Sequence, residues 1–232
     1  MPDGVCGIVS TNAAAGPPAR GAPASLTPEL PEELFGQAAA CDRCPRMKGR
    51  RRVLGPLNGR VPAQVMFVGE APGRLGAEVT GVPFKGDLAG RNFERLLEGA
   101  GLDRNAVFIT NAVICNPRSS NGTNSRPTAS EIRNCSAWLR QTVRLVDPKL
   151  VVSLGVVALA ALGGLEAHRL TLARDVGRAV EWSDRLLLPL YHPGGRAMAR
   201  RPFSRQQQDW SAIASALAGL RLDDDGPTRL SV

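Results

Sequence analysis

The sequence predicts a three-layer α/β/α domain whose central sheet has four parallel strands. Four short apolar segments have the length and composition of buried strands, at residues 65–68, 106–113, 148–155 and 186–191. Segments with helical spacing alternate with them, and this alternation is typical of a parallel sheet with helices on both faces. The chain has 232 residues, of which 43% are hydrophobic, so it can build one core of this size.

Helices are expected where apolar residues recur at helical spacing, in segments 27–40, from about 92, 128–145, 156–162 and 204–220. The first contains Pro31, a residue that suits an early helical position. The third opens with Thr128 and Glu131 at capping-box spacing. Residues 166–180 have no pattern that assigns an element, so we expect partly exposed structure there.

The predicted domain spans residues 28–222 and lies between two terminal tails. Residues 1–27 are rich in Ala, Pro and Gly without apolar periodicity, and they contain the isolated Cys6. Such a composition favours a flexible segment. Residues 223–232 form a second, polar tail.

The chain is basic, with a formal net charge of +8 at pH 7. A charge of this size favours a polyanionic partner, most simply nucleic acid, although a protein can be basic without such a partner. No apolar run approaches the roughly 20 residues that cross a bilayer, and the N-terminus has no signal-peptide pattern. We expect an intracellular, monomeric protein that does not bind membranes.

Four cysteines form a candidate metal site, with Cys41 and Cys44 in a CxxC pair and Cys115 and Cys135 as distant partners. Four thiolates suit zinc or an iron–sulfur cluster, and their spacing does not choose between the two. The alternatives are a redox CxxC, which the absence of a preceding strand disfavours, and unrelated buried thiols. An arginine-rich run at 46–60 follows and is placed to meet phosphates, or else forms a solvated face.

A glycine-rich segment, residues 69–90, follows the first strand and leads into a helix. A strand, a glycine-rich loop and a helix together form a ligand cradle at the carboxyl end of a strand. The loop carries two acidic candidates, Glu70 and Asp87, and one aromatic residue, Phe84. It has neither GxGxxG nor Gly-Lys-Ser/Thr, so it is no dinucleotide fingerprint and no P-loop. A purely structural turn is the alternative.

Two further strand ends carry polar side chains, Asn111 after the second strand and His192 after the fourth. The carboxyl ends of parallel strands meet at one edge of the sheet, so we expect both residues to face the glycine-rich segment across a single crevice. From spacing alone, Asn111 also suits a turn cap, His192 a core pair with Tyr191, Asp87 a helix cap, and Phe84 the core. Residues 116–127 are polar and predict an exposed loop.

The segments CDRCPRM, GEAPG, TGVPFKGDLAG, ITNAVICNP and HPGGRA, in this order, resemble the iron–sulfur uracil-DNA glycosylases from Cys41 to Trp210. GEAPG looks like the family 4 enzymes and TGVPFKGDLAG looks more like the family 5 enzymes, which tolerate a wider range of bases. The resemblance implies the glycosylase α/β/α fold and excision of a base from DNA. It also implies a [4Fe–4S] cluster on the four cysteines, with zinc as the alternative.

The resemblance further implies roles for the predicted site residues. Asn111 would pair with the edge of a flipped base, and His192 would stabilise charge at its O2. Asp87, or else Glu70, would position or activate the water and stabilise the cationic sugar electrostatically. The remaining implied contacts are Gly69, Ala71, Gly73 and Phe84 with the base, and Arg196, Met198, Arg51 and Arg52 with DNA.

The chain departs from the family at one position of the histidine motif, where Gly194 stands in place of the usual serine. It also lacks the basic, histidine-bearing insertion of the covalent branch of the superfamily. We therefore expect a monofunctional uracil-DNA glycosylase, which removes uracil, with other deaminated bases as further candidate substrates. The alternatives are a non-catalytic iron–sulfur DNA-binding module, which the intact candidate residues argue against, and an unrelated nucleotide-binding enzyme.

Overall fold

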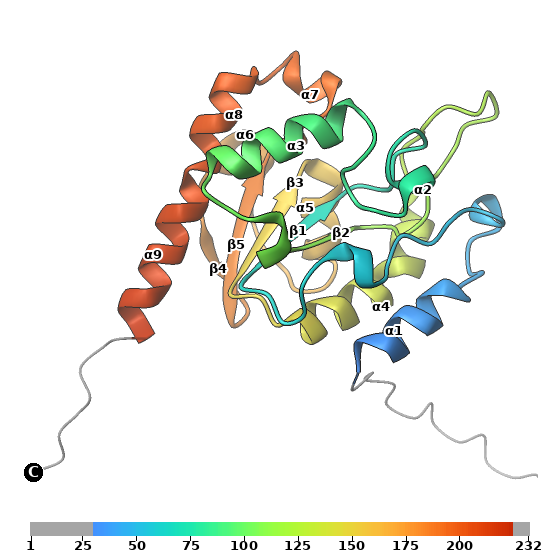
Figure 1. Cartoon of the computed structure of the whole chain (residues 1–232), viewed down its shortest axis with the longest axis horizontal. Helices are drawn as coiled ribbons and strands as arrows, with labels where there is room; N and C mark the ends of the chain where they lie inside the picture. Colours follow the sequence, from blue (N-terminus) through green and yellow to red (C-terminus); the bar gives the residue numbers. More distant parts are fainter. Residues whose placement is uncertain (1–29, 225–232) are drawn as a thin grey trace, which may run out of the picture.

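The computed structural model describes residues 30–224 and has the predicted α/β/α architecture (Figure 1). The predicted tail at 1–27, with Cys6, lies outside the described residues, as does 225–232. A single sheet runs through the middle of the domain in the order β2-β1-β3-β5-β4. Its strands are β1 Val65–Gly69, β2 Phe108–Asn111, β3 Leu150–Leu154, β4 Val180–Trp182 and β5 Arg185–Leu190.

The sheet has five strands, so the prediction of four is corrected. β1, β2, β3 and β5 are the four predicted strands, and they pair in parallel. The extra strand, β4, is antiparallel to β5 at the sheet edge. It has three residues, of which only Trp182 is buried, and it joins β5 through a tight turn at Ser183, whose φ is +59°. A strand this short at an exposed edge has no apolar run, so the sequence pattern does not predict it.

The helices surround the sheet. They are α1 Pro31–Ala39, α2 Ala77–Thr80, α3 Leu88–Gly99, α4 Ala129–Val146, α5 Val156–Gly163, α6 Leu172–Asp175, α7 Gly195–Met198, α8 Phe203–Trp210 and α9 Ala212–Asp224, with 3₁₀ turns at Pro45–Met47, Pro56–Asn58 and Arg104–Ala106. The predicted final helix is divided in two at Ser211, whose hydroxyl donates to the Gln208 carbonyl. A hydroxyl bonded back to the preceding turn bends helices. α9 continues to Asp224, two residues into the predicted polar tail.

Every residue of β1, β2 and β3 is buried. Successive side chains of a strand point to opposite faces, so both faces of the sheet are covered. In β1, Met66 and Val68 pack into one core cluster, whereas Val65 and Phe67 pack into the other. Residues of α1, α4 and α5 complete the first cluster, and residues of α3, α8 and α9 complete the second. Figure 1 shows these two groups of helices on opposite sides of the sheet. The two helical layers thereby fix the sheet from both sides.

The parallel strands bring their carboxyl ends to one edge. Gly69, the last residue of β1, is in register with Asn111, the last residue of β2. β5 ends at Leu190, two residues before His192. Within residues 30–224, the helices are all too short or too polar to cross a membrane.

Candidate active site

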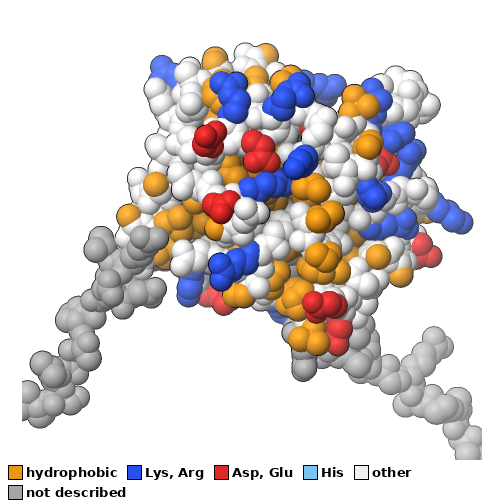
Figure 2. All heavy atoms as spheres, in the orientation of Figure 1, with side chains coloured by type: hydrophobic (Ala, Val, Ile, Leu, Met, Phe, Trp, Pro, Cys, Tyr) orange, Lys and Arg blue, Asp and Glu red, His pale blue; other side chains and the backbone are white. Residues whose placement is uncertain are grey.

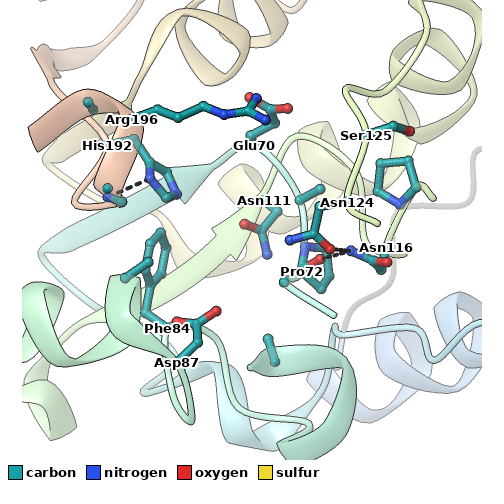
Figure 3. A pocket seen from close by; sticks show the side chains of 18 residues that line it. Glu70, Pro72, Phe84, Asp87, Asn111, Asn116, Asn124, Ser125, His192 and Arg196 are labelled. Atoms are coloured by element: carbon teal, nitrogen blue, oxygen red, sulfur yellow. Dashed lines mark hydrogen bonds between the residues drawn. The ribbon is translucent and has the colours of Figure 1, made fainter. Parts of the chain in front are cut away.

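A cavity of about 450 Å³ opens at the carboxyl ends of β1, β2 and β5. Its lining includes all four predicted catalytic side chains: Glu70, Asp87, Asn111 and His192. Figure 3 shows these side chains converging from three segments that are far apart in the sequence. The single crevice expected from the strand ends is therefore present.

Asn111 is buried, with 3% of its surface exposed, and its side-chain amide makes no hydrogen bond to any described residue. A buried amide normally has partners. Here it faces the cavity, so its donors and its acceptor are available to a ligand (Figure 3). Gly69 makes this position possible, because a Cβ at 69 would lie 2.5 Å from Asn111 Oδ1 and 3.1 Å from the Phe84 ring.

Asp87 is both a helix cap and a cavity residue. Its Oδ1 accepts from the Gly90 N–H at 2.8 Å and caps α3, which therefore begins at Leu88 and not near residue 92 as predicted. Its Oδ2 lies against two glycines: a Cβ at Gly73 or Gly76 would approach it to 2.7 or 2.6 Å. These glycines leave room for a carboxylate oxygen that makes no hydrogen bond within residues 30–224.

His192 is held as a neutral ring of defined tautomer. The Gly194 backbone N–H donates to His192 Nδ1 at 2.9 Å. Because a backbone N–H can only donate, Nδ1 is the acceptor and the neutral ring carries its proton on Nε2. Burial lowers the pKa of His192 to about 4, although the Asp87 carboxylate acts in the opposite direction. At neutral pH the site therefore offers an uncharged Nε2–H donor.

The glycine at 194, where the family's histidine motif usually has serine, has a steric reason. A Cβ at this position would lie 2.8 Å from His192 Nδ1, which is too close, and 3.1 Å from its Cε1, which is tight. With glycine, the chain approaches the ring closely enough for the Gly194 N–H to bond Nδ1. A serine at 194 would require the ring or the loop to move.

Phe84 lies between the core and the cavity. Its ring stacks on Phe93 at 4.6 Å between centroids and lies 5.5 Å from the His192 ring. Its φ of +50° falls in the left-handed region, which is unusual for a bulky residue. Gly90 permits this backbone shape, since a Cβ there would meet the Phe84 carbonyl oxygen at 2.6 Å. The ring is thus both packed against the core, as the alternative prediction had it, and part of the cavity wall.

Glu70 and Arg196 line the rim of the cavity together (Figure 3). Burial raises the pKa of Glu70, while the charges of Arg126 and Arg196 lower it by less. Ala71 and Gly73 also line the cavity, whereas Gly69 acts from behind by making room for Asn111.

The predicted exposed loop, residues 116–127, forms the opposite wall of the cavity. Asn116, Pro117, Asn124 and Ser125 line it, and sequence reasoning missed all four. Asn116 Nδ2 donates to the Pro72 carbonyl at 2.5 Å and to Asn124 Oδ1 at 3.0 Å. Arg118 bonds Asn116 Oδ1 at 3.1 Å and pairs with Glu78 at 2.6 Å. Two of these partners, Pro72 and Glu78, lie about 40 residues away in the chain, so no local pattern identifies them.

Three of the predicted DNA-contacting side chains have partners inside the protein. Arg52 donates to the carbonyls of Cys41 and Arg50, and Arg51 donates to the carbonyls of α2. The Met198 side chain packs on the second core cluster, and its Sδ accepts from Gln206 Nε2 at 3.4 Å. Arg196, in contrast, is exposed at the mouth of the cavity.

The four predicted metal-binding cysteines are not joined by disulfides. Burial raises the pKa of Cys115 to about 12 and of Cys135 to about 11, and the neighbouring thiols add to both shifts. Two sulfurs accept hydrogen bonds, Cys41 Sγ from Trp138 Nε1 at 3.3 Å and Cys44 Sγ from Asn134 Nδ2 at 3.4 Å. In the described part of the chain, these side chains do not close on one point as a ligand group. The kind and number of donors nevertheless fit a four-thiolate centre.

Comparisons with known proteins place this geometry in a family. Residues 57–217 match the Uracil DNA glycosylase superfamily. A protein named Type-5 uracil-DNA glycosylase from Pyrobaculum aerophilum is 30% identical over 190 residues, 70% of this chain and 81% of the relative. A Type-4 uracil-DNA glycosylase from the same organism is 34% identical over 171 residues, 71% of this chain and 82% of the relative.

A third relative, named Type-4 uracil-DNA glycosylase, comes from Saccharolobus solfataricus. It is 31% identical over 192 residues, which cover 80% of this chain and 85% of the relative. Relatives of both types match this chain, so the resemblance to families 4 and 5 is confirmed. The family match extends over more than half of the sequence and includes the cavity and every strand of the sheet, and on that basis the chain belongs to the uracil DNA glycosylase superfamily.

Proposed function

We propose that this protein is a DNA repair glycosylase that hydrolyses the N-glycosidic bond of uracil in DNA and leaves an abasic site. One observation carries the proposal: three polar groups that make no hydrogen bond to described residues converge on one cavity beside an aromatic ring. They are the Asn111 amide, Asp87 Oδ2 and His192 Nε2. A base inside a duplex is out of reach of such groups, so the enzyme must flip it into the cavity.

The flipped base is recognised by Phe84 and Asn111 in this proposal. The Phe84 ring, already supported from behind by Phe93, stacks on the base. The free Asn111 amide offers both a donor and an acceptor, which the carbonyl and N–H of a uracil edge can pair with. Burial of the amide strengthens this preference, because a base that left it unpaired would incur a desolvation cost.

His192 stabilises the departing base. Negative charge develops on the base as the glycosidic bond breaks, and the neutral Nε2–H is aimed into the cavity as a fixed donor. A donor already in place needs no reorganisation during the reaction. The Gly194 contact supplies that fixation, because it sets both the tautomer and the orientation of the ring.

Asp87 supplies the negative charge near the sugar. Its Oδ1 is fixed by the α3 cap, and its Oδ2 is free to orient water and to stabilise a cationic sugar. Glu70 is the second acidic candidate at the cavity. Its pKa is raised above that of an ordinary glutamate, so its carboxyl is protonated more readily. Glu70 is therefore the weaker candidate for a charge-stabilising role.

DNA binding rests on the basic surface. The chain carries a net charge of +8, and Figure 2 shows several Lys and Arg side chains on the edge where the loop segments lie in Figure 1. Arg196 is the predicted DNA contact best supported by its position at the cavity mouth. Arg51, Arg52 and Met198 remain predictions, and their internal contacts favour a role in shaping this surface.

A [4Fe–4S] cluster held by Cys41, Cys44, Cys115 and Cys135 completes the proposal, with zinc as the alternative. Such a centre would tie the segment after α1 to the segment after β2 and to α4, a structural role without a step in the reaction. The N–H donors aimed at Cys41 and Cys44 support this, because cluster sulfurs commonly accept such bonds. Purified protein should then be brown and contain about four irons per chain; folded, colourless protein with bound zinc would select the alternative.

The test of the activity uses oligonucleotides with a single uracil, hypoxanthine, xanthine or mismatched thymine, in single and double strands. Released base and alkali-labile abasic sites are measured against an undamaged control strand. The proposal requires abasic sites at uracil. Tight DNA binding without release of any base would instead favour the non-catalytic DNA-binding module.

An intracellular location and a monomeric state belong to the same proposal. The proposed use of Cys41, Cys44, Cys115 and Cys135 as metal ligands fits a reducing compartment, where structural disulfides are rare. Light scattering of the purified protein tests the monomeric state directly.

A further inference from the structure

The wall of the cavity formed by residues 116–127 includes Asn124, whose side-chain amide has an unused donor among the described residues. This residue lines the same cavity as Asn111 and His192. In Figure 3 its amide nitrogen points across the cavity towards Asn111, on the side away from His192. No role for this loop follows from the groups already assigned to the reaction.

Hydrogen bonds determine which end of the Asn124 amide faces the cavity. Its Oδ1 lies 3.1 Å from the Arg74 backbone nitrogen and 3.0 Å from Asn116 Nδ2. A backbone N–H can only donate, so the atom it meets is the carbonyl oxygen and not the NH₂ group. Asn124 Nδ2 is therefore the opposite end, and within residues 30–224 it donates to no other group.

The loop that carries Asn124 is held by one internal bridge and by contacts on two sides. Arg118 and Asn124 form an isolated antiparallel bridge, which makes the segment a small hairpin. Arg118 ties this hairpin to Glu78 at 2.6 Å. On its other side, Arg46 donates to Ser125 Oγ at 2.7 Å. A donor on a fixed support can select a ligand, because little freedom is lost when the bond forms.

We propose that Asn124 is a specificity-determining residue whose Nδ2 donates to the oxygen at C4 of a flipped uracil, on the side of the cavity opposite His192. The inference rests on the proposed function, in which His192 faces the O2 of the base. Deamination converts an amino group at this ring position into a carbonyl, so a second donor there favours the deaminated base. In cytosine the group at this position is an amino group, which is also a donor. It would face the NH₂ group of Asn124 without forming a hydrogen bond.

The test replaces Asn124 with aspartate. Asn124→Asp keeps an oxygen for the Arg74 N–H and for Asn116 Nδ2 but removes the donor that faces the cavity. Asn121→Asp is the matched control, because Asn121 lies in the same hairpin, accepts only from Ser119 and Thr123, and does not line the cavity. Both variants add the same charge to the same loop. Thermal unfolding of each establishes that the fold is retained.

Single-turnover excision is compared for two substrates, uracil and pyrimidin-2-one, which lacks the oxygen at C4. The added charge acts on both substrates, whereas the lost hydrogen bond acts on uracil alone, so the ratio of the two rates isolates the contact. We expect Asn124→Asp to lower this ratio about 10-fold, as loss of one hydrogen bond does, and Asn121→Asp to leave it at the wild-type value.

An unchanged ratio in Asn124→Asp, with wild-type protein active on uracil, would overturn the role of Asn124 alone. An equal fall in both variants would also overturn it, because the effect would then come from charge or from the loop as a whole. Wild-type protein that excises neither base would instead overturn the proposed function itself.

Discussion

The two sides of the cavity differ in how their polar groups are used. On the strand side, Asn111, His192 and Asp87 each have at least one polar atom without a partner among the described residues. On the loop side, Asn116 uses both of its amide atoms, and Arg118 is paired with Glu78. The first side is ready to bind a ligand, whereas the second, apart from the unused Asn124 donor, holds its own shape.

This difference shows how a polar site can stay open without collapsing. Unpaired buried groups are costly, and they persist when the surrounding structure prevents them from finding partners. The hydrogen-bonded groups of the loop wall, the α3 cap and the glycines at 69, 73, 76 and 194 supply that constraint here. Function on one side of the cavity therefore depends on stability on the other.

The largest expected effect comes from the free oxygen of Asp87. Asp87→Asn keeps an oxygen to cap α3, since Asn and Asp cap equally well, but it removes the charge from the cavity. We expect single-turnover uracil excision to slow by about 100- to 10,000-fold, with the thermal midpoint nearly unchanged. The control is Glu70→Gln: if that variant slows excision and Asp87→Asn does not, the essential acid is Glu70.

A smaller effect is expected from adding a side chain beside His192. Gly194→Ser places a Cβ 2.8 Å from the position of His192 Nδ1, so the imidazole must move. A displacement of about 1 Å in a catalytic group costs up to about 100-fold in rate, and we expect a loss of about 10- to 100-fold. Gly195→Ser is the matched control, because no atom lies within 4 Å of the Cβ that it would add. Equal rates for the two variants would show that the Gly194 contact does not position the ring.

On the loop side, a substitution should lower the stability of the fold more than it lowers the rate of excision. Arg46 makes a bidentate pair with the buried Glu131, at 2.8 and 2.5 Å, and also bonds Ser125. Arg46→Gln leaves the Glu131 carboxylate without its ion pair. We expect the free energy of unfolding to fall by about 1–3 kcal/mol, measured by urea denaturation, while Lys48→Gln, an exposed change nearby, has little effect.

The same pair has a defined pH dependence. The hydrogen bond from Arg46 lowers the pKa of Glu131, so the pair stabilises the fold above the ordinary glutamate pKa. That stability is lost as pH falls through the lowered value. The difference in stability between wild type and Arg46→Gln should therefore shrink on acidification; a difference that grows instead would contradict this assignment.

The smallest expected effect is the change in His192 ionisation between pH 5 and pH 8. Burial lowers its pKa to about 4, so the ring is neutral throughout this range and gains a proton only as pH falls through about 4. NMR titration should find no ionisation of this imidazole near its ordinary value of about 6.5. Stability from the neutral ring should be complete above that value and decline below it. An imidazole that titrates near 6.5 would contradict the lowered pKa and with it the neutral ring proposed for this range.

Sequence patterns predicted the features that depend on neighbouring residues. Apolar runs located the four parallel strands, and the rule that strand ends converge brought Asn111 and His192 to one cavity. The two readings of Asp87, cap and acid, were left open by its spacing, and the structure shows that its two oxygens are directed to different places.

The loop wall could not be predicted in this way. Asn116, Arg118 and Asn124 have the composition of an exposed turn, and their partners Pro72, Glu78 and Arg74 lie about 40 to 50 residues away. β4 was missed for a related reason, because its pairing with β5 gives it strand geometry without an apolar run. Gly194 was visible as a departure from the family motif, but only the distance to the His192 ring gives it a reason.

Uracil excision by wild type and Asn111→Ala, measured in single turnover on the same oligonucleotide, tests the central claim most directly. Wild-type protein should release uracil, and the variant should be slower by about 100- to 1000-fold, as for other lost donors to a reacting group. Affinity for an abasic-site oligonucleotide should be similar for both, because phosphate contacts carry most of it. Excision at the wild-type rate by Asn111→Ala, with that affinity intact, would place the active site outside this cavity.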